Sequence, residues 1–225
     1  MIKSRVAVQE TDLLISCDKP VDLQYCRSRI MLYRRQIQSY ISRDERFLTS
    51  LKPVSVERIA PAIVRSMADA ALKADVGPMA AVAGAIAWFV GKDLIKKGCR
   101  ELIVENGGDI FARSARRVTV GIYAGRACAG GRIKLLAGPF PGSFGICSSS
   151  GTVGHSLSFG KADCVTIVAS NSVLADSAAT ACANRVNSKD DFPAALSFAR
   201  SIRGVKGVLI ACKKDILLWG KIQLA

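Results

Sequence analysis

The first part of the chain alternates hydrophobic and polar positions in a way that predicts two strands followed by helices. The stretch RVAVQETDLLISC (residues 5–17) reads as two short strands around a turn at residues 10–12. In VDLQYCRSRIMLYRRQIQSYI (21–41), apolar residues recur at helical spacing with arginines between them, which predicts a surface helix. A further helix is expected over 57–74, with Pro61 at its start.

The segment VGPMAAVAGAIAWFVGKDLIKKG (76–98) predicts a second helix that is almost wholly apolar and therefore central and buried. Gly77, Gly84 and Gly91 recur every seven residues, close to one face of this helix. Because these positions carry no side chain, another backbone can approach closely there. The apolar run 79–90 is shorter than the roughly 20 residues that span a bilayer, so no membrane segment is expected.

The second half of the chain contains runs of strands between helices. The stretch ELIVENGGDIFARS (101–114) reads as strand, tight turn, strand. We also expect strands over 117–125, 132–138 and 163–170, helices over 174–186 and 191–202, and a closing hairpin over 205–220. This order, without a linker or repeat, predicts a single α+β domain over 1–225, with a largely antiparallel or mixed sheet packed with helices.

The composition indicates a globular, cytoplasmic protein. Half of the 225 residues are hydrophobic and 22% are charged, which excludes a disordered chain. The N-terminus shows no signal-peptide pattern, and the eight cysteines lie among apolar or small neighbours, as in a reducing compartment. No two cysteines are spaced C-x-x-C and His155 is the one histidine, which argues against a structural zinc site.

The net charge of +14 attracts anions, from nucleotides to nucleic acid. However, no nucleic-acid motif accompanies it, and 6% aromatic residues are too few for a base-stacking platform. The sequence therefore favours a solvated basic surface and disfavours nucleic acid as a partner.

Two short motifs suggest a site for an anionic ligand and a metal. In ENGGD, Gly107 and Gly108 can adopt positive φ and form an anion-binding nest, although Asn-Gly is also a favoured hairpin dipeptide. Asp176 and Thr180 are four residues apart on a predicted helix, so their oxygens face the same way and could bind Mg²⁺. The alternative is that Asp176 caps its own helix.

Two further segments are candidate ligand contacts. In DVGPMAAVAG (75–84), exposed N–H groups at a helix start would favour a phosphate, or the segment is simply a helix start. The stretch GICSSSGTVGHSLSFG (145–160) is too polar and glycine-rich for a core strand, so it is expected to be a ligand loop or a mobile surface loop. It has no G-x-S-x-G frame, which argues against a serine hydrolase.

In chain order, the motifs DVGPMAAVAG, VENGGDI, SSSGTVGHS and LADSAATACAN resemble the ApbE family of magnesium-dependent flavin transferases. The similarity is closest to a small cytoplasmic ApbE-like branch and runs from about residue 5 to 190. The resemblance implies that Asp176, Thr180 and a backbone carbonyl near Pro78 bind Mg²⁺. It also implies that FAD or FMN contacts a set of small and polar residues: Gly77, Pro78, Asn106, Gly107, Gly108, Asp109, Ser149, Ser150, Gly151 and Thr152.

The same resemblance places His155 in the flavin site, where a neutral imidazole could take the proton of an attacking hydroxyl. The chain departs from the transferases in two places. SLSFGKAD follows His155 in place of Asp-Pro-x-Thr-Gly, and Ala81 and Val82 stand where transferases carry a lysine.

The expected activity is therefore FMN transfer from FAD to a protein Thr or Ser, or cleavage of the FAD pyrophosphate. The alternative is a non-catalytic binding protein for a flavin or another anionic nucleotide. Expected partners are the nucleotide and an acceptor protein, without a membrane, and the sequence allows a homodimer.

Overall fold

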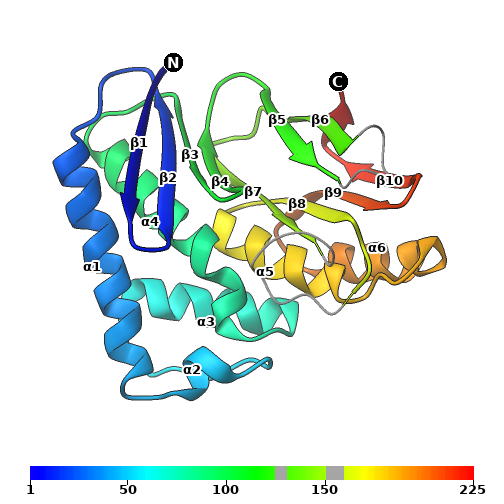
Figure 1. Ribbon diagram of the computed structural model, residues 1–225, viewed down its shortest axis with the longest axis horizontal. Helices are drawn as coiled ribbons and strands as arrows, with labels where there is room; N and C mark the ends of the chain where they lie inside the picture. The colour runs from blue at the N-terminus through cyan, green and yellow to red at the C-terminus, as the bar shows by residue number, and fades with distance from the viewer. Residues whose placement is uncertain (125–130, 151–159) are drawn as a thin grey trace.

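The structure is a computed structural model that describes residues 1–124, 131–150 and 160–225. Its largest element is an eight-stranded sheet in the order β1-β2-β3-β4-β7-β8-β9-β10, with neighbouring strands antiparallel (Figure 1). The strands are β1 (Ile2–Val8), β2 (Thr11–Cys17), β3 (Leu102–Asn106), β4 (Asp109–Arg113), β7 (Ser143–Ser149), β8 (Cys164–Ala169), β9 (Val205–Cys212) and β10 (Asp215–Gly220).

A smaller three-stranded sheet covers one face of the large sheet. Its order is β11 (Ile222–Leu224), β6 (Arg132–Ala137) and β5 (Val118–Tyr123). Buried side chains of both sheets, among them Ile110, Leu135 and Phe144, form one hydrophobic cluster between them.

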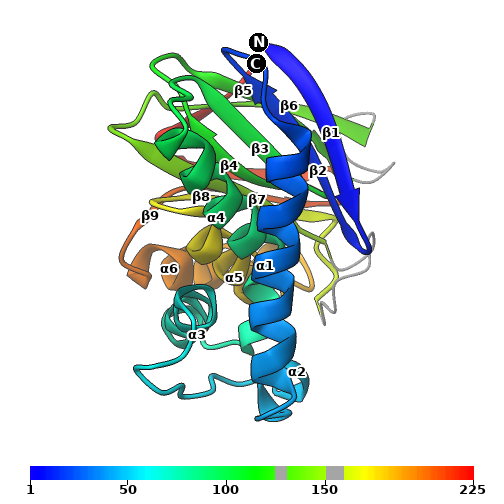
Figure 2. The same ribbon diagram turned by 90° about the vertical axis from the view of Figure 1, so that its left-hand side faces the viewer.

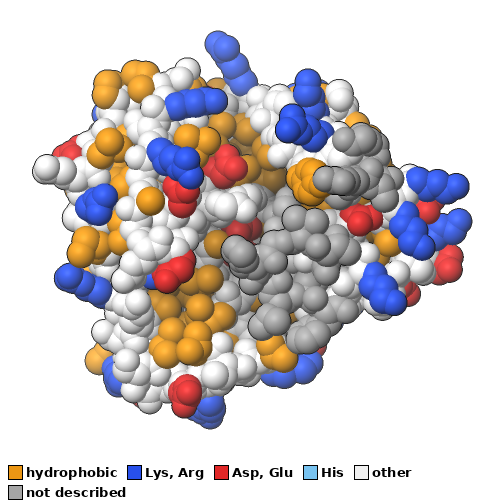
Figure 3. All heavy atoms as spheres, viewed as in Figure 1, with side chains coloured by type: hydrophobic (Ala, Val, Ile, Leu, Met, Phe, Trp, Pro, Cys, Tyr) orange, Lys and Arg blue, Asp and Glu red, His pale blue; other side chains and the backbone are white. Residues whose placement is uncertain are grey.

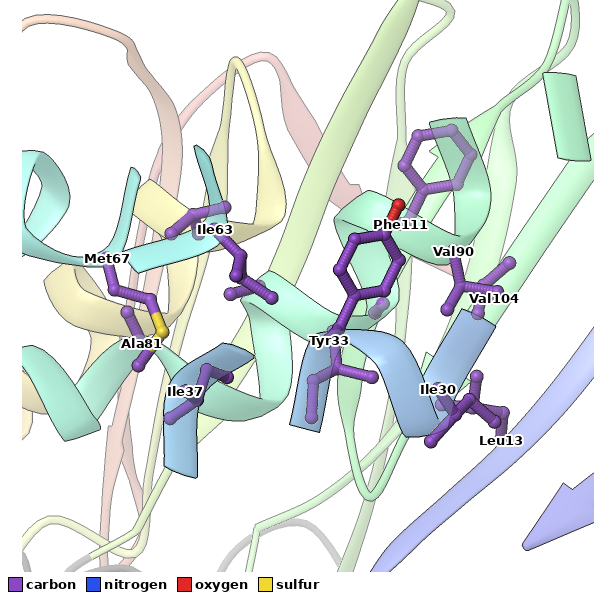
Figure 4. Close-up of a cluster of buried hydrophobic side chains, with 14 of the residues drawn as sticks. Leu13, Ile30, Tyr33, Ile37, Ile63, Met67, Ala81, Val90, Val104 and Phe111 are labelled. Atoms are coloured by element: carbon purple, nitrogen blue, oxygen red, sulfur yellow. The ribbon is translucent and has the colours of Figure 1, made fainter. Parts of the chain in front are cut away.

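Helices cover the other face of the large sheet (Figure 2). They are α1 (Leu23–Ile41), α2 (Arg46–Thr49), α3 (Ala62–Ala74), α4 (Val82–Lys96), α5 (Ser172–Ala183) and α6 (Phe192–Ser201), with short 3-10 helices at Pro78–Ala81 and Lys189–Asp191. Strand β4 shows how the layers divide: Phe111 packs with the helices, whereas its neighbours Ile110 and Ala112 pack with the small sheet, as the period of a strand requires. Figure 4 shows Leu13, Ile30, Val90 and other side chains from β2, α1 and α4 in the helix-side core.

Helix α4 lies in this core. Its glycines Gly84 and Gly91, and Gly77 just before the preceding 3-10 helix, permit the close contacts that the sequence predicts. A Cβ atom on Gly77 would lie 1.8 Å from the backbone oxygen of Ser50, and one on Gly84 would lie 2.3 Å from that of Ser172. A Cβ on Gly91 would meet the ring of Phe111 at 2.5 Å. By length and composition the segment Pro78–Lys96 could cross a membrane, but most of it is buried inside the molecule, as befits a core helix.

The predicted α+β class is confirmed, and the antiparallel sheet is as expected. The interpretation of residues 145–160 as a loop too polar for a core strand is wrong for its first part, since β7 lies between β4 and β8. Its small residues make this possible. Ser148 Oγ and Thr166 Oγ1 satisfy each other at 2.8 Å, and Gly145 leaves room for the start of α5. Residues 151–159 lie outside the described residues.

Candidate functional site

A cleft of about 1260 Å³ opens between the two sheets and the helix layer. The turn between β3 and β4, the end of β7, strand β5, the start of α4 and the loop after α2 line it. Figure 3 shows the hollow in the middle of this face, with acidic side chains at its edge. Of the predicted site residues, the cleft is lined by Gly77, Asn106, Gly107, Gly108, Asp109, Ser149, Ser150 and Thr180. Segments that are far apart in the sequence therefore meet at this cleft.

The glycine turn is both a hairpin and a wall of the cleft. Asn106 and Asp109 pair across β3 and β4, so Gly107 and Gly108 form a two-residue turn with φ values of +64° and +112°. The Asn106 side chain donates a hydrogen bond to the carbonyl oxygen of Ala83 at 3.1 Å, which fixes the turn against the start of α4. The two interpretations left open by the sequence are thus compatible.

Asp176 does not cap its own helix, so that alternative is wrong. Helix α5 begins at Ser172, and the side chain of Asn171 caps it by accepting a hydrogen bond from the amide of Leu174 at 2.8 Å. Asp176 lies one turn further along and accepts a 2.8 Å hydrogen bond from the amide of Gly84 in the first turn of α4. This helix start therefore holds a protein carboxylate, which the helix dipole stabilises.

Asp109 lines the cleft and forms an acidic pair with Asp176, which does not itself line the cleft. Burial raises the pKa of Asp109 to about 7. Burial, and then the charge of Asp109, raise the pKa of Asp176 well above its usual range, whereas the hydrogen bond from Gly84 lowers it. Oδ1 of Asp109 and Oγ of Ser149 are buried without a hydrogen-bond partner in the described part of the chain. Two neighbouring desolvated carboxylates, one with an unpartnered oxygen on Asp109, fit a hard divalent cation such as Mg²⁺.

Charged residues that the sequence reasoning did not single out border the cleft. Arg34 forms an ion pair with Glu10 and donates to Thr11 Oγ1 at 3.0 Å. Asp75 contacts both Lys52 Nζ, at 3.3 Å, and a guanidinium nitrogen of Arg185, at 3.9 Å. Asp75 begins the motif DVGPMAAVAG, but no short motif contains Arg34, Lys52 or Arg185, which come from elements that are distant in sequence.

The family model described as "AbpE bacteria" matches residues 2–216 of the chain. The chain belongs to this ApbE-like family. Its relatives include a UPF0280 protein of Methanococcus maripaludis strain C5, 39% identical over 224 residues, and one of Methanocaldococcus jannaschii, 40% identical over 225 residues. Each alignment covers 98% of this chain and 91% of the relative.

Solved ApbE structures share the fold of this ApbE-like chain. A point mutant of the flavin transferase ApbE from Vibrio cholerae superposes with a TM-score of 0.64 at 14% identity, covering 98% of this chain and 97% of that one. The apo flavinyl transferase ApbE from Pseudomonas stutzeri gives a TM-score of 0.62 at 10% identity, covering 98% and 94%. At such low identity, the superpositions show a common fold, and the chemistry has to be argued from the site.

Four further residues that the sequence predicts for the ApbE-like site, Pro78, Gly151, Thr152 and His155, are not among those that line the cleft in the described part of the chain. Pro78 is buried and does not line the cleft, whereas its neighbours Gly77 and Met79 do. Gly151, Thr152 and His155 lie outside the described residues, so their predicted contacts stay predictions.

Proposed function

We propose that this protein binds FAD or FMN together with Mg²⁺ in the cleft. The observation that carries the proposal is the acidic pair in which Asp109, a residue of the cleft wall, keeps a buried, unpartnered oxygen beside Asp176. Mg²⁺ accepts few protein oxygens and leaves its other positions to water and phosphates. The cleft volume of about 1260 Å³ exceeds the roughly 300–1,000 Å³ of ordinary ligand pockets, which suits a dinucleotide.

The metal ligands that we propose are Asp176, Thr180 and a backbone carbonyl near Pro78. Asp176 and Thr180 follow one another along one side of α5, and the bond from Gly84 holds one Asp176 oxygen in place. When bound, Mg²⁺ would neutralise charge on the pyrophosphate. The amides of the Asn106–Asp109 turn, with Ser149, Ser150, Gly151 and Thr152, would contact the nucleotide and orient it.

The proposed reaction is cleavage of FAD at its pyrophosphate. A hydroxyl oxygen of the acceptor attacks the phosphorus of the FMN half, the bond to the AMP phosphate breaks, and AMP leaves. His155 takes the proton of the attacking hydroxyl. The acceptor is a Thr or Ser of another protein, or water. We place this activity in the cytoplasm, because the seven described cysteines are buried and none forms a disulfide.

The second candidate is binding without turnover. At the start of α4, where the resemblance implies a lysine in transferases, Ala81 is buried and Val82 presents an apolar side chain to the cleft. Neither can stabilise charge that develops during phosphoryl transfer, so the chain has lost one group that the transferase reaction uses.

Incubation of the protein with FAD and Mg²⁺, with and without a cell extract of candidate acceptors, separates these functions. AMP and FMN are quantified by chromatography and protein-bound flavin by mass spectrometry. We expect AMP release that EDTA stops and that His155→Asn lowers by about 10²–10⁴ across pH 5.5 to 9. FAD binding without AMP in any mixture favours the binding protein, and the absence of FAD binding overturns the proposal.

A further inference from the structure

A second group of potential metal ligands lies outside the cleft. The Sγ atoms of Cys17 and Cys99 and a carboxylate oxygen of Asp18 all lie within 4.8 Å of one another. Both cysteines are buried, whereas Asp18 is exposed. Thr11, at the other end of β2, lines the cleft. Because a seven-residue strand is about 20 Å long, the two places are separate.

Backbone contacts hold the two segments of this thiol–carboxylate cluster together. Cys17 pairs with Leu102 in the register of β2 and β3, and the amide of Asp18 donates to the carbonyl of Glu101 at 3.0 Å. The amide of Arg100 donates to Asp18 Oδ1 at 3.2 Å. Lys19 Nζ reaches the carbonyl of Lys97 at 2.7 Å. The three ligand atoms therefore converge on a framework that is built before any ion arrives.

The spacing of these atoms suits a tetrahedral cation. Cys17 Sγ lies 3.3 Å from Asp18 Oδ1. Bonds of about 2.3 Å to sulfur and about 2.0 Å to oxygen at tetrahedral angles place sulfur and oxygen about 3.5 Å apart, and two sulfurs about 3.8 Å apart. Small side-chain rotations would thus bring all three atoms onto one ion, with a fourth position left for water on the exposed side.

We propose that Cys17, Asp18 and Cys99 bind a thiophilic divalent cation, with Zn²⁺ as the best fit. Two thiolates disfavour Mg²⁺ and Ca²⁺, and the carboxylate disfavours Cu(I). The ion would join the turn between α4 and β3, which carries Cys99, to the end of β2, which carries Cys17 and is followed by Asp18. Without the ion, the Cys17 thiol donates a hydrogen bond to Asp18. Metal binding would replace the protons of both thiols and release them. The sequence argues against structural zinc through the absence of C-x-x-C spacing and the single histidine, whereas Cys17 and Cys99 are far apart in sequence and are brought together by the fold.

Titration of the reduced, chelator-stripped protein with Co²⁺ tests this site. We expect one equivalent to give thiolate-to-cobalt charge transfer and intense tetrahedral d–d bands, which Zn²⁺ removes and Mg²⁺ does not. Cobalt held by Asp176 and Thr180 would have oxygen ligands and no such charge transfer, and a band that persists in Cys17→Ser would come from a thiol of the cleft such as Cys164. Cys17→Ser and Cys99→Ser should each weaken binding at least about 100-fold, and Asp18→Asn about 10–100-fold. The control Cys212→Ser, a buried thiol on β9, should bind as the wild type does.

Asp18 is exposed, so Asp18→Asn tests the site even if the cysteine variants fail to fold. A second readout is protection of the wild-type thiols: Zn²⁺ should shield Cys17 and Cys99, but not Cys26, from a maleimide in mild denaturant. Absence of the sulfur charge-transfer band overturns the proposal, as do variants that bind Co²⁺ like the wild type. Isolation of a Cys17–Cys99 disulfide from unreduced protein, with no bound zinc, would also overturn it.

Discussion

Thr180 and Ser177 are both buried on α5, but only Thr180 lines the cleft. If Thr180 is a ligand of Mg²⁺, Thr180→Val keeps its shape and removes one ligand oxygen. We expect the Mg²⁺ affinity, measured by calorimetry in the presence of ADP, to fall about 10-fold or more. Ser177→Ala is the matched control. Its hydroxyl has no hydrogen-bond partner in the described part of the protein, so its loss should be neutral or stabilising.

The two variants together decide the role of Thr180. Equal Mg²⁺ affinity in Thr180→Val and in the wild type would make Thr180 a packing residue. A similar loss of affinity in Ser177→Ala would mean that any change on this helix disturbs the site, and the assignment of Thr180 would fail.

The raised pKa of Asp109 predicts how the free energy of unfolding depends on pH in the metal-free protein. Its pKa is about 7 in the folded chain and near 3.9 unfolded, so between pH 4 and 7 the folded state keeps a proton that the unfolded state has lost. Stability should therefore fall as pH rises through this window, by about 2–4 kcal/mol for this group, and level off above it. Asp109→Asn should flatten the decline and stabilise the chelator-treated protein at pH 7.5.

Urea unfolding from pH 5 to 8 measures this effect. Added Mg²⁺ should restore stability to the wild type more than to Asp109→Asn, because a cation at Asp176 would offset the charge of the neighbouring Asp109 carboxylate. The same pH slope in both proteins would show that Asp109 is not desolvated as described.

At the scale of elements, the contact between α4 and α5 sets the position of Asp176. Gly84 packs against the backbone of Ser172, whose hydroxyl donates to the Gly84 carbonyl at 2.7 Å. A Cβ on Gly84 would also lie 2.8 Å from the Cβ of Asp176. Gly84→Ala should therefore push the helices apart, at a cost of about 1–3 kcal/mol, and weaken Mg²⁺ binding.

Gly121→Ala is the control for this prediction. Gly121 also borders the cleft, but a Cβ there would meet nothing within 4 Å. Thermal unfolding and Mg²⁺ titration of both variants provide the comparison. A Gly84→Ala protein as stable and as metal-competent as Gly121→Ala would contradict the assigned role of this contact.

The sequence predicted elements well where one periodicity dominates. The 3.6-residue period of α1 and the glycine spacing of α4 are local signals, and both were correct. Strand β7 was missed because Ser148 finds its hydrogen-bond partner in Thr166 across the sheet and Gly145 packs against Ser172 on α5. Composition carries no information about such partners.

The candidate site was predictable only in part, for the same reason. Motifs marked Asp109, Thr180 and the glycine turn because their residues are close in sequence. The pairing of Asp176 with Gly84, and the charged border at Arg34 and Asp75, depend on tertiary contacts between distant segments. The thiol–carboxylate cluster was missed for this reason as well.

At the scale of the whole molecule, the cleft and the thiol–carboxylate cluster occupy opposite ends of β2 and β3. Because the two share no described side chain and lie about 20 Å apart along β2, perturbations should add independently. We expect Asp18→Asn to bind FAD and Mg²⁺ within about twofold of the wild type. A large loss of FAD affinity in this variant would show that the two ends are coupled.

The central claim is that the cleft binds a flavin nucleotide through a metal held by Asp176. The most direct test is the FAD affinity with and without Mg²⁺, measured by equilibrium titration of FAD fluorescence. The proteins compared are the wild type, Asp176→Asn and the control Asp190→Asn. The carboxylate of Asp190 lies away from the cleft. We expect tight binding that needs Mg²⁺ in the wild type and in Asp190→Asn, and at least about 10-fold weaker binding in Asp176→Asn. Equal FAD affinity in all three proteins, with or without Mg²⁺, would contradict it.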